Sequence, residues 1–373
     1  MTESVVFDVL PAANDKKIGI ATLNVEKKLN SLTQQMVMLL TDQLIQWEQD
    51  DSIVCIWLQG AGEKAFCAGG DVRCLRDRIA EVGPQAALPY VQSFFENEYR
   101  LDYLIHCYSK PIICWGHGIV MGGGIGLMSG ASHRVVTETS RLAMPEITIG
   151  LYPDVGGTWF LNHAPGRTGL FLGLTGANFN AADAMFVGMA DRFIPSMKKQ
   201  SVLDGLQKQA WTDCTRENEV LVGTVLRSCE VLDLMPAGNV RQHYDVIQAV
   251  TDADSAAGVA ANILAIDSDE KWLQKAAATL KSGCPSTAHL VFEQLRRGKK
   301  LSLPEVFQME LVMSLQCALH PDFPEGVRAL LVDKDGAPQW QHQSVAEVSP
   351  QWVEEHFQAP WPDGVNPLQD LAW

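Results

Sequence analysis

Short apolar runs alternate with helical patterns through the first two hundred residues. Apolar residues recur at helical spacing over 33–47 and over 86–107, which predicts two amphipathic helices. Runs rich in β-branched residues predict strands at 5–9, 18–23, 53–58, 111–115 and 134–138. Strands that alternate with helices in this way indicate an α/β domain.

The pattern changes beyond about residue 200, where no strand signal of comparable strength occurs. Helical periodicity predicts six helices, over 202–211, 218–231, 256–266, 270–281, 286–297 and 304–320. We therefore expect a core over residues 1–200 and a mainly helical region over 201–373, with a Pro- and Trp-rich tail from Ala359.

Residues 111–132 carry no formal charge and are numerous enough to span a bilayer. Seven of these 22 residues are glycine, and each glycine costs a helix interior about 0.8–1 kcal/mol relative to alanine. We expect instead a buried strand, a glycine turn and the start of a helix, and therefore no membrane span.

Charge and short motifs exclude several functions. Lys and Arg number 29 against 44 Asp and Glu, a net charge of −15, so nucleic acid is not an expected partner. No phosphate-binding loop, dinucleotide fingerprint or serine-hydrolase elbow occurs. Nine cysteines form no C-x-x-C pair and no His cluster has zinc spacing, so we expect no metal and no other cofactor. Free cysteines, and an N-terminus without a targeting pattern, predict a cytoplasmic protein.

Two glycine-rich turns each follow a strand and lead into a predicted helix: AFCAGGDV at 65–72 and MGGGIGL at 121–127. Small residues let a ligand approach backbone N–H groups, and a helix N-terminus favours negative charge. Either turn alone is also explained as a tight turn without function. Facing each other, the two would form an oxyanion hole.

Three carboxylates lie in apolar surroundings. Glu146 and Asp154 belong to the glycine-rich stretch MPEITIGLYPDVGGT at 144–158, and Glu98 falls on the apolar stripe of its predicted helix. Glu146 also suits the first turn of a helix as a dipole-stabilising surface residue. Glu98 fits a structural ion pair as well as a site, because an unpaired buried charge is very costly.

These segments, in this order, resemble the crotonase (enoyl-CoA hydratase/isomerase) superfamily over about 5–195, with a weaker echo at 322–335. The resemblance implies a spiral of β-β-α units and an acyl-CoA thioester as ligand. It also implies a thioester oxygen held by the N–H groups of Ala68 and Gly123. Gly70 and Asp71, in the first turn, are then expected to contact the substrate.

Within that superfamily the hydratases use two glutamates, and this chain has Gly126 at the first of those positions and Glu146 at the second. The chain resembles the 3-hydroxyisobutyryl-CoA hydrolase branch instead, through Asp154 in YPDVGG and Glu98 in FFENEY. That branch implies hydrolysis of a short branched β-hydroxyacyl-CoA in valine breakdown. Glu146 would attack the carbonyl or activate water, and Asp154 and Glu98 would hold the substrate hydroxyl or the water.

Two alternatives stay open at this point. The first is a hydratase or double-bond isomerase that relies on Glu146 alone for proton transfer. The second is a catalytically silent acyl-CoA-binding protein whose carboxylates are structural. The resemblance also leaves a homo-oligomer open, since relatives often assemble through their C-terminal helices.

Overall fold

The computed structural model describes residues 3–372, which form two compact units, each built from three segments of the chain. Unit 1 combines the chain up to Gly70 with Leu101–Leu142 and Phe179–Asn239. Unit 2 combines Asp71–Arg100, Ala143–Asn178 and the chain from Val240. The expected division at residue 200 stays a prediction, because compactness does not show which segment folds by itself.

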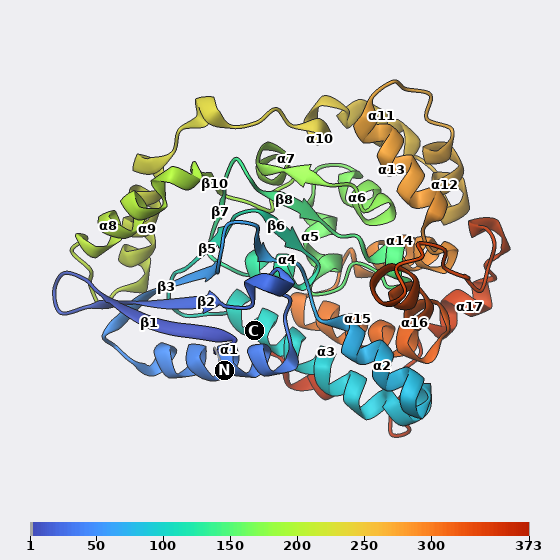
Figure 1. Cartoon of the computed structure of the whole chain (residues 1–373), viewed down its shortest axis with the longest axis horizontal. Coiled ribbons are helices and arrows are strands. Elements are labelled where there is room, and N and C mark those ends of the chain that lie inside the picture. Colours follow the sequence, from blue (N-terminus) through green and yellow to red (C-terminus); the bar gives the residue numbers. More distant parts are fainter. Residues whose placement is uncertain (1–2, 373) are drawn as a thin grey trace. The chain divides into compact units, whose positions relative to one another are not determined.

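Unit 1 is built on a six-stranded sheet in the order β1-β2-β3-β5-β7-β10 (Figure 1). Strands β1 and β2 pair antiparallel, and all other neighbours are parallel. The strands are β1(Val5–Pro11), β2(Lys17–Leu23), β3(Ile53–Gly60), β5(Ile112–Gly116), β7(His133–Val136) and β10(Arg192–Phe193). The five strands predicted from the sequence are all present.

Between residues 53 and 143, successive strands alternate between two sheets. β3, β5 and β7 belong to the first sheet, and the strand after each belongs to a second sheet of β4(Ala65–Cys67), β6(Ile119–Met121), β8(Arg141–Ala143) and β9(Phe179–Asn180). A helix follows β4 and another follows β6, namely α2(Val72–Val82) and α4(Gly123–Ser129). The predicted α/β fold with repeated β-β-α units is confirmed.

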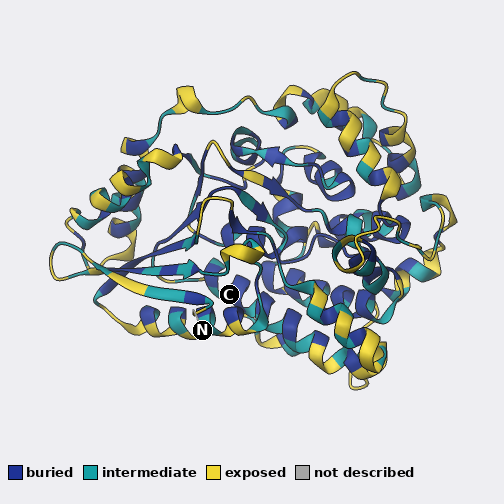
Figure 2. Ribbon diagram, in the orientation of Figure 1, coloured by how far each residue is buried: buried dark blue, intermediate teal, exposed yellow. Residues whose placement is uncertain are grey.

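Strand β3 is buried on both faces, and its alternating side chains contact different layers. Cys55 and Trp57 belong to a core completed by α8(Lys199–Gln207) and α9(Thr215–Cys229). Trp57 stacks on Trp115 of β5 with ring centroids 5.4 Å apart. In Figure 2 the central strands are dark blue, whereas α8 and α9 turn exposed positions outward.

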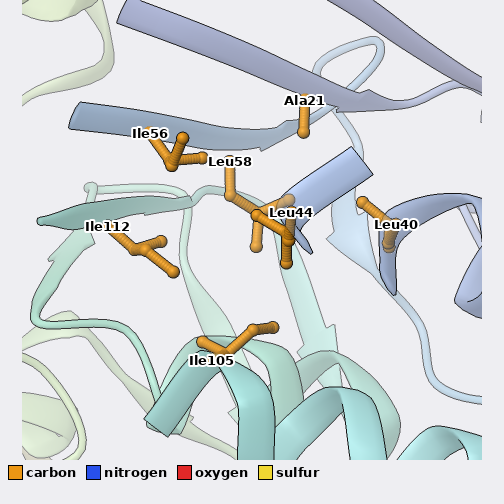
Figure 3. A pocket seen from close by; sticks show the side chains of 7 residues that line it. All are labelled: Ala21, Leu40, Leu44, Ile56, Leu58, Ile105 and Ile112. Atoms are coloured by element: carbon orange, nitrogen blue, oxygen red, sulfur yellow. The ribbon is translucent and has the colours of Figure 1, made fainter. Parts of the chain in front are cut away.

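Ile56 and Leu58 point to the opposite face, toward α1(Gln34–Gln49) and the end of α3(Pro84–His106). Figure 3 shows these side chains around a gap of about 10 Å³ that is also lined by Ala21, Leu40, Leu44, Ile105 and Ile112. Only carbon lines this space, which has room for about one water but no hydrogen-bond partner for it. We interpret the gap as a packing void rather than a ligand site.

Unit 2 is helical, apart from its loops. Helix α14 packs on α5, α6 and α12, and α15 packs on α5 and α16. Its principal helices after residue 143 are α5(Gly157–His163), α6(Thr168–Thr175), α11(Tyr244–Val250), α12(Ala256–Leu264), α13(Lys271–Ser282), α14(Pro285–Gly298), α15(Leu303–Leu319), α16(Asp322–Val327) and α17(Pro350–Glu355) (Figure 1). The six helices predicted beyond residue 200 are present. Within residues 3–372, no helix has the length and apolarity that crossing a bilayer requires.

Candidate active site

The two glycine turns come together inside unit 1. A Cβ atom placed on Gly69 would lie 3.2 Å from the main-chain oxygen of Met121 and 3.7 Å from the nitrogen of Gly123. One placed on Gly124 would lie only 2.3 Å from the main-chain oxygen of Cys67. Backbone packs directly against backbone here, so glycine is required at both positions.

The main-chain donors of these turns differ in how they are used. The N–H of Ala68 donates to the main-chain oxygen of Leu29 at 3.0 Å. Gly123 is the first residue of α4, so its N–H has no partner within the helix. Within residues 3–372, no hydrogen bond is formed by the N–H of Gly70 either. The assignment of Ala68 as an oxyanion donor is therefore corrected, since its proton is already engaged, and Gly70 is the available donor in this turn.

Three carboxylates cluster within unit 2. Glu98 lies on α3, Glu146 begins the short helix η2(Glu146–Ile149), and Asp154 lies in the loop before α5. Their exposed fractions are 2%, 5% and 5%. Burial and, to a smaller extent, the charge of Asp154 raise the pKa of both Glu98 and Glu146, which places all three carboxylates within electrostatic reach of one another. Asp71, the remaining predicted site residue, lies at the N-terminal boundary of α2.

Local backbone geometry fixes Glu146. Pro145 precedes η2, and Gly150 ends it in the left-handed conformation at φ +69°. The N–H groups of Gly150 and Leu151 both donate to the main-chain oxygen of Glu146. Glu146 lies in the first turn of η2, but its side chain is buried, so the alternative reading of Glu146 as a surface residue is wrong.

The loop that carries Asp154 is bent by two consecutive left-handed residues, Val155 at φ +55° and Gly156 at φ +85°. A β-branched residue rarely adopts this conformation, so the surrounding contacts must hold it. Glu310 of α15 does so by accepting hydrogen bonds from the N–H groups of Gly156 and Thr158, both at 2.8 Å. The bend keeps the Asp154 side chain within the buried cluster.

Burial dominates the electrostatics of the cluster. Desolvation, with a smaller contribution from Asp154, raises the pKa of Glu98 to about 8 and that of Glu146 well above its usual range. Desolvation raises the pKa of Asp154 to about 6, against the opposing effect of a hydrogen bond from Tyr99 at 2.7 Å. None of these causes is a lysine, arginine or histidine.

Two oxygens of this cluster lack a hydrogen-bond partner within residues 3–372, Oε1 of Glu98 and Oε2 of Glu146. Buried polar atoms are almost always hydrogen-bonded, so orphaned ones suggest a site that a ligand completes. The described residues contain no group of three or more His, Cys, Asp or Glu side chains arranged to hold a metal ion.

The sequence did not point to four residues that support the carboxylates: Tyr99, Tyr152, Glu310 and Ser314. Tyr99 follows Glu98 directly and could have been found from its aromatic neighbourhood. Glu310 and Ser314 lie more than 150 residues beyond Asp154 in the chain. Only the tertiary structure brings α15 to this loop.

A sequence profile of the enoyl-CoA hydratase/isomerase family matches residues 18–357. That range includes both glycine turns and all three buried carboxylates. The chain belongs to the enoyl-CoA hydratase/isomerase family. The sequence had indicated two features of this chain that support the assignment: the β-β-α repeats and the paired glycine turns.

Members of the family with established names are similar over nearly the whole chain. The 3-hydroxyisobutyryl-CoA hydrolase, mitochondrial, of Danio rerio is 39% identical over 344 residues, which cover 91% of this chain and 87% of that protein. A carnitinyl-CoA dehydratase structure from Mycobacterium thermoresistibile superposes with a TM-score of 0.84 at 34% identity, covering 97% and 98% of the two chains. An enoyl-CoA hydratase structure from Rhodobacter sphaeroides 2.4.1 superposes with a TM-score of 0.83 at 32% identity, covering 98% of this chain and 99% of that chain. The predicted resemblance and the crotonase fold are confirmed.

The expectation of a cytoplasmic protein is wrong, because the hydrolase relative in this family is mitochondrial by name. None of the nine cysteines, which all lie within residues 3–372, forms a disulfide bond. Free thiols report a reducing environment, which is a redox property and not a cellular address. Cysteine usage therefore does not indicate the cellular compartment of this protein.

Proposed function

We propose that this chain hydrolyses the thioester of a short branched β-hydroxyacyl-CoA, 3-hydroxyisobutyryl-CoA, to 3-hydroxyisobutyrate and coenzyme A. The hydrolase relative at 39% identity supports this activity. The observation that carries the chemistry is the trio Glu98, Glu146 and Asp154, which is buried and has two oxygens without a hydrogen-bond partner among the described residues. Such a trio suits a reaction that moves protons and attacks a carbonyl carbon.

The thioester oxygen is stabilised by main-chain donors in this proposal. The N–H groups of Gly70 and Gly123 are the donors, since neither has a partner within the described residues. Such donors stabilise the negative oxygen of the tetrahedral intermediate, and each is worth about 3–4 kcal/mol of barrier in other enzymes. Ala68 then supports the turn through its bond to Leu29.

Glu146 is the reacting carboxylate, by one of two routes. In the first, its ionised oxygen attacks the thioester carbon, the carbon–sulfur bond breaks, and water hydrolyses the resulting anhydride. In the second, it takes a proton from the water that attacks the carbon. Burial raises its pKa, so its ionised form is a stronger base than an exposed glutamate. Both routes give one acid and one thiol.

Glu98 and Asp154 hold the β-hydroxyl group of the substrate or the attacking water. The unpaired oxygen of Glu98 is the available acceptor. A site that hydrogen-bonds a hydroxyl rejects the analogue without it strongly, because its own buried polar groups are then left unpaired. The expected preference for 3-hydroxyisobutyryl-CoA over isobutyryl-CoA is on the order of 10²–10⁴ in kcat/KM.

Hydration of an enoyl-CoA is the second candidate, favoured by the name of the solved relative from Rhodobacter sphaeroides 2.4.1. Hydration needs positioned acid and base groups near both carbons of the double bond. Position 126, where the hydratases of this family were expected to carry one of those groups, is a buried glycine in α4. This absence favours hydrolysis.

A substrate panel tests the proposal. Thiol release and loss of the enoyl chromophore are measured with 3-hydroxyisobutyryl-CoA, isobutyryl-CoA and crotonyl-CoA. We expect thiol from the hydroxylated ester, little from isobutyryl-CoA, and no hydration of crotonyl-CoA. Hydration of crotonyl-CoA without thiol release from any ester would establish the second candidate instead.

A further inference from the structure

Three hydroxyl groups connect Asp154 to the main chain of α15 within unit 2. Tyr99 lies 2.7 Å from Oδ2 of Asp154 and 2.7 Å from Oγ of Ser314. Ser314 in turn lies 2.8 Å from the hydroxyl of Tyr152, which donates to the main-chain oxygen of Glu310. We call Tyr99, Ser314 and Tyr152 the hydroxyl chain.

The hydroxyl chain has one more contact than it has protons. Four oxygen-to-oxygen contacts of this length each require a proton between the two atoms, and three hydroxyls supply three. The oxygen of Glu310 is a carbonyl and can only accept. If Asp154 is ionised, Tyr99 donates to it and Tyr152 donates to Glu310. The single proton of Ser314 then serves only one of its two neighbours.

A proton on Asp154 removes this deficit. Asp154 then donates to Tyr99, Tyr99 to Ser314, Ser314 to Tyr152, and Tyr152 to the carbonyl of Glu310. All four contacts are satisfied in one direction. The three hydroxyl residues are each 0% exposed, and within residues 3–372 their side chains form no hydrogen bond besides these four contacts.

The groups around Asp154 also favour a proton there. Three glutamates face it: Glu98 of α3, Glu146 of η2 and Glu310 of α15, and Cys317 of α15 is within electrostatic reach. No cation contributes to its pKa, which burial raises to about 6. Repulsion between carboxylates and the hydroxyl chain therefore act in the same direction.

We propose that Ser314, a positioning residue, holds a proton on Asp154 through the hydroxyl chain, so that Asp154 acts as the acid that protonates the departing thiolate of coenzyme A. This role rests on the proposed hydrolysis. The O–H bond of Asp154 breaks and an S–H bond forms on coenzyme A. Asp154 regains a proton from the water that hydrolyses the acyl group, while the hydroxyl of that water goes to the acid product. The proton of Tyr99 points to Asp154 when Asp154 is ionised and to Ser314 when Asp154 is protonated, while Tyr152 donates to Glu310 in both states.

The test is an infrared titration of the carboxylic-acid band of Asp154, assigned by its loss in Asp154→Asn. Ser314→Ala and Tyr152→Phe each remove one proton and two contacts, which leaves two contacts and two protons. Both variants should lower the pKa of Asp154 by about one unit, a tenfold change in proton affinity. Tyr99→Phe removes the donor to the carboxylate and should shift the pKa upward.

The opposite directions of these pKa shifts distinguish the proposed role of Ser314 from a purely structural one. General loosening of the core would admit water and shift the pKa of Asp154 in the same direction in all three variants. That result would overturn the proposal, and so would an unchanged pKa in Ser314→Ala and Tyr152→Phe. Ser286→Ala is the matched control, since Ser286 is also buried in unit 2 but contacts His342. Ser314→Thr keeps the hydroxyl and should restore the wild-type value. If Ser314→Ala does not fold, Tyr152→Phe gives the same sign.

The titration needs no substrate, so it is independent of the proposed function. If the wild-type protein releases no thiol yet titrates as described, the hydrolysis and its acid step are disproved. The claim that the hydroxyl chain holds a proton on Asp154 would still stand. With hydrolysis established, Ser314→Ala should lower kcat about tenfold and leave KM within about twofold, because the variant changes the proton population of Asp154 and not substrate contacts.

Discussion

Glu98, Glu146 and Asp154 are buried together although each prefers water when ionised, so the fold holds them at a cost in free energy. The hydrogen bond between Tyr99 and Asp154 offsets part of that cost. The unpaired oxygens of Glu98 and Glu146 do not. Sites that keep such groups for chemistry are commonly less stable than they could be.

The first prediction concerns the stability cost of Glu98. Its pKa is about 8 in the folded protein against an ordinary value of 4.5. The unfolded chain therefore loses this proton first, so the stability associated with Glu98 is present below pH 4.5 and lost as pH rises to 8. Glu98→Gln should raise the free energy of unfolding at pH 8 by about 4 kcal/mol and leave it nearly unchanged near pH 4.5.

Chemical denaturation at the two pH values measures this effect. Glu63→Gln is the control, because Glu63 is exposed and its substitution should change stability by less than about 0.5 kcal/mol at either pH. A Glu98→Gln variant that is destabilised equally at both pH values would show that Glu98 is a structural partner instead.

Single residues differ in how far the sequence predicted them. Glu98 was found because a carboxylate on an apolar stripe is conspicuous. Ser314 was not, since a serine in an apolar helix is ordinary and its partners are distant in sequence. Ala68 was assigned as a donor by resemblance, but the hydrogen bond from its N–H to Leu29 is a tertiary contact that no local pattern reveals.

At the scale of elements, the long helices and the central strands follow from periodicity, whereas the two-residue strands β9 and β10 do not. So short a strand carries too few side chains for an alternating pattern. The glycine turns were predicted as strand, turn and helix start, which β5, β6 and α4 confirm. Their mutual contact was an expectation that required the fold.

The second prediction belongs to this scale and concerns the contact between the two glycine turns. An alanine at position 124 would place its Cβ 2.3 Å from the main-chain oxygen of Cys67 and force the two turns apart. We expect Gly124→Ala to lower the free energy of unfolding by about 2–3 kcal/mol and to abolish thiol release. Denaturation curves and the thiol assay measure both effects.

Gly223 supplies the matched control, since it lies inside helix α9 and its nearest atom to an added Cβ is 4.0 Å away. Gly223→Ala should stabilise the protein by about 0.5–1 kcal/mol and leave thiol release unchanged. Equal behaviour of the two variants would mean that close backbone packing does not matter to the turns.

At the scale of the whole molecule, the sequence indicated the family but not how the chain is partitioned. Each compact unit draws on three separate segments. Periodicity is read along the chain, so it divides a sequence into consecutive pieces and cannot reveal interleaved ones. The expected lack of nucleic-acid binding and the boundary at residue 200 stay predictions, and a homo-oligomer stays open.

The proposed hydrolysis depends on one carboxylate, Glu146, reacting with a thioester. The most direct measurement compares thiol release from 3-hydroxyisobutyryl-CoA by the wild-type protein and by Glu146→Gln, with substrate affinity measured on both. We predict that kcat falls by about 10³-fold or more while affinity stays within a few-fold. An unchanged rate in Glu146→Gln, or equal losses of rate and affinity, would contradict the account.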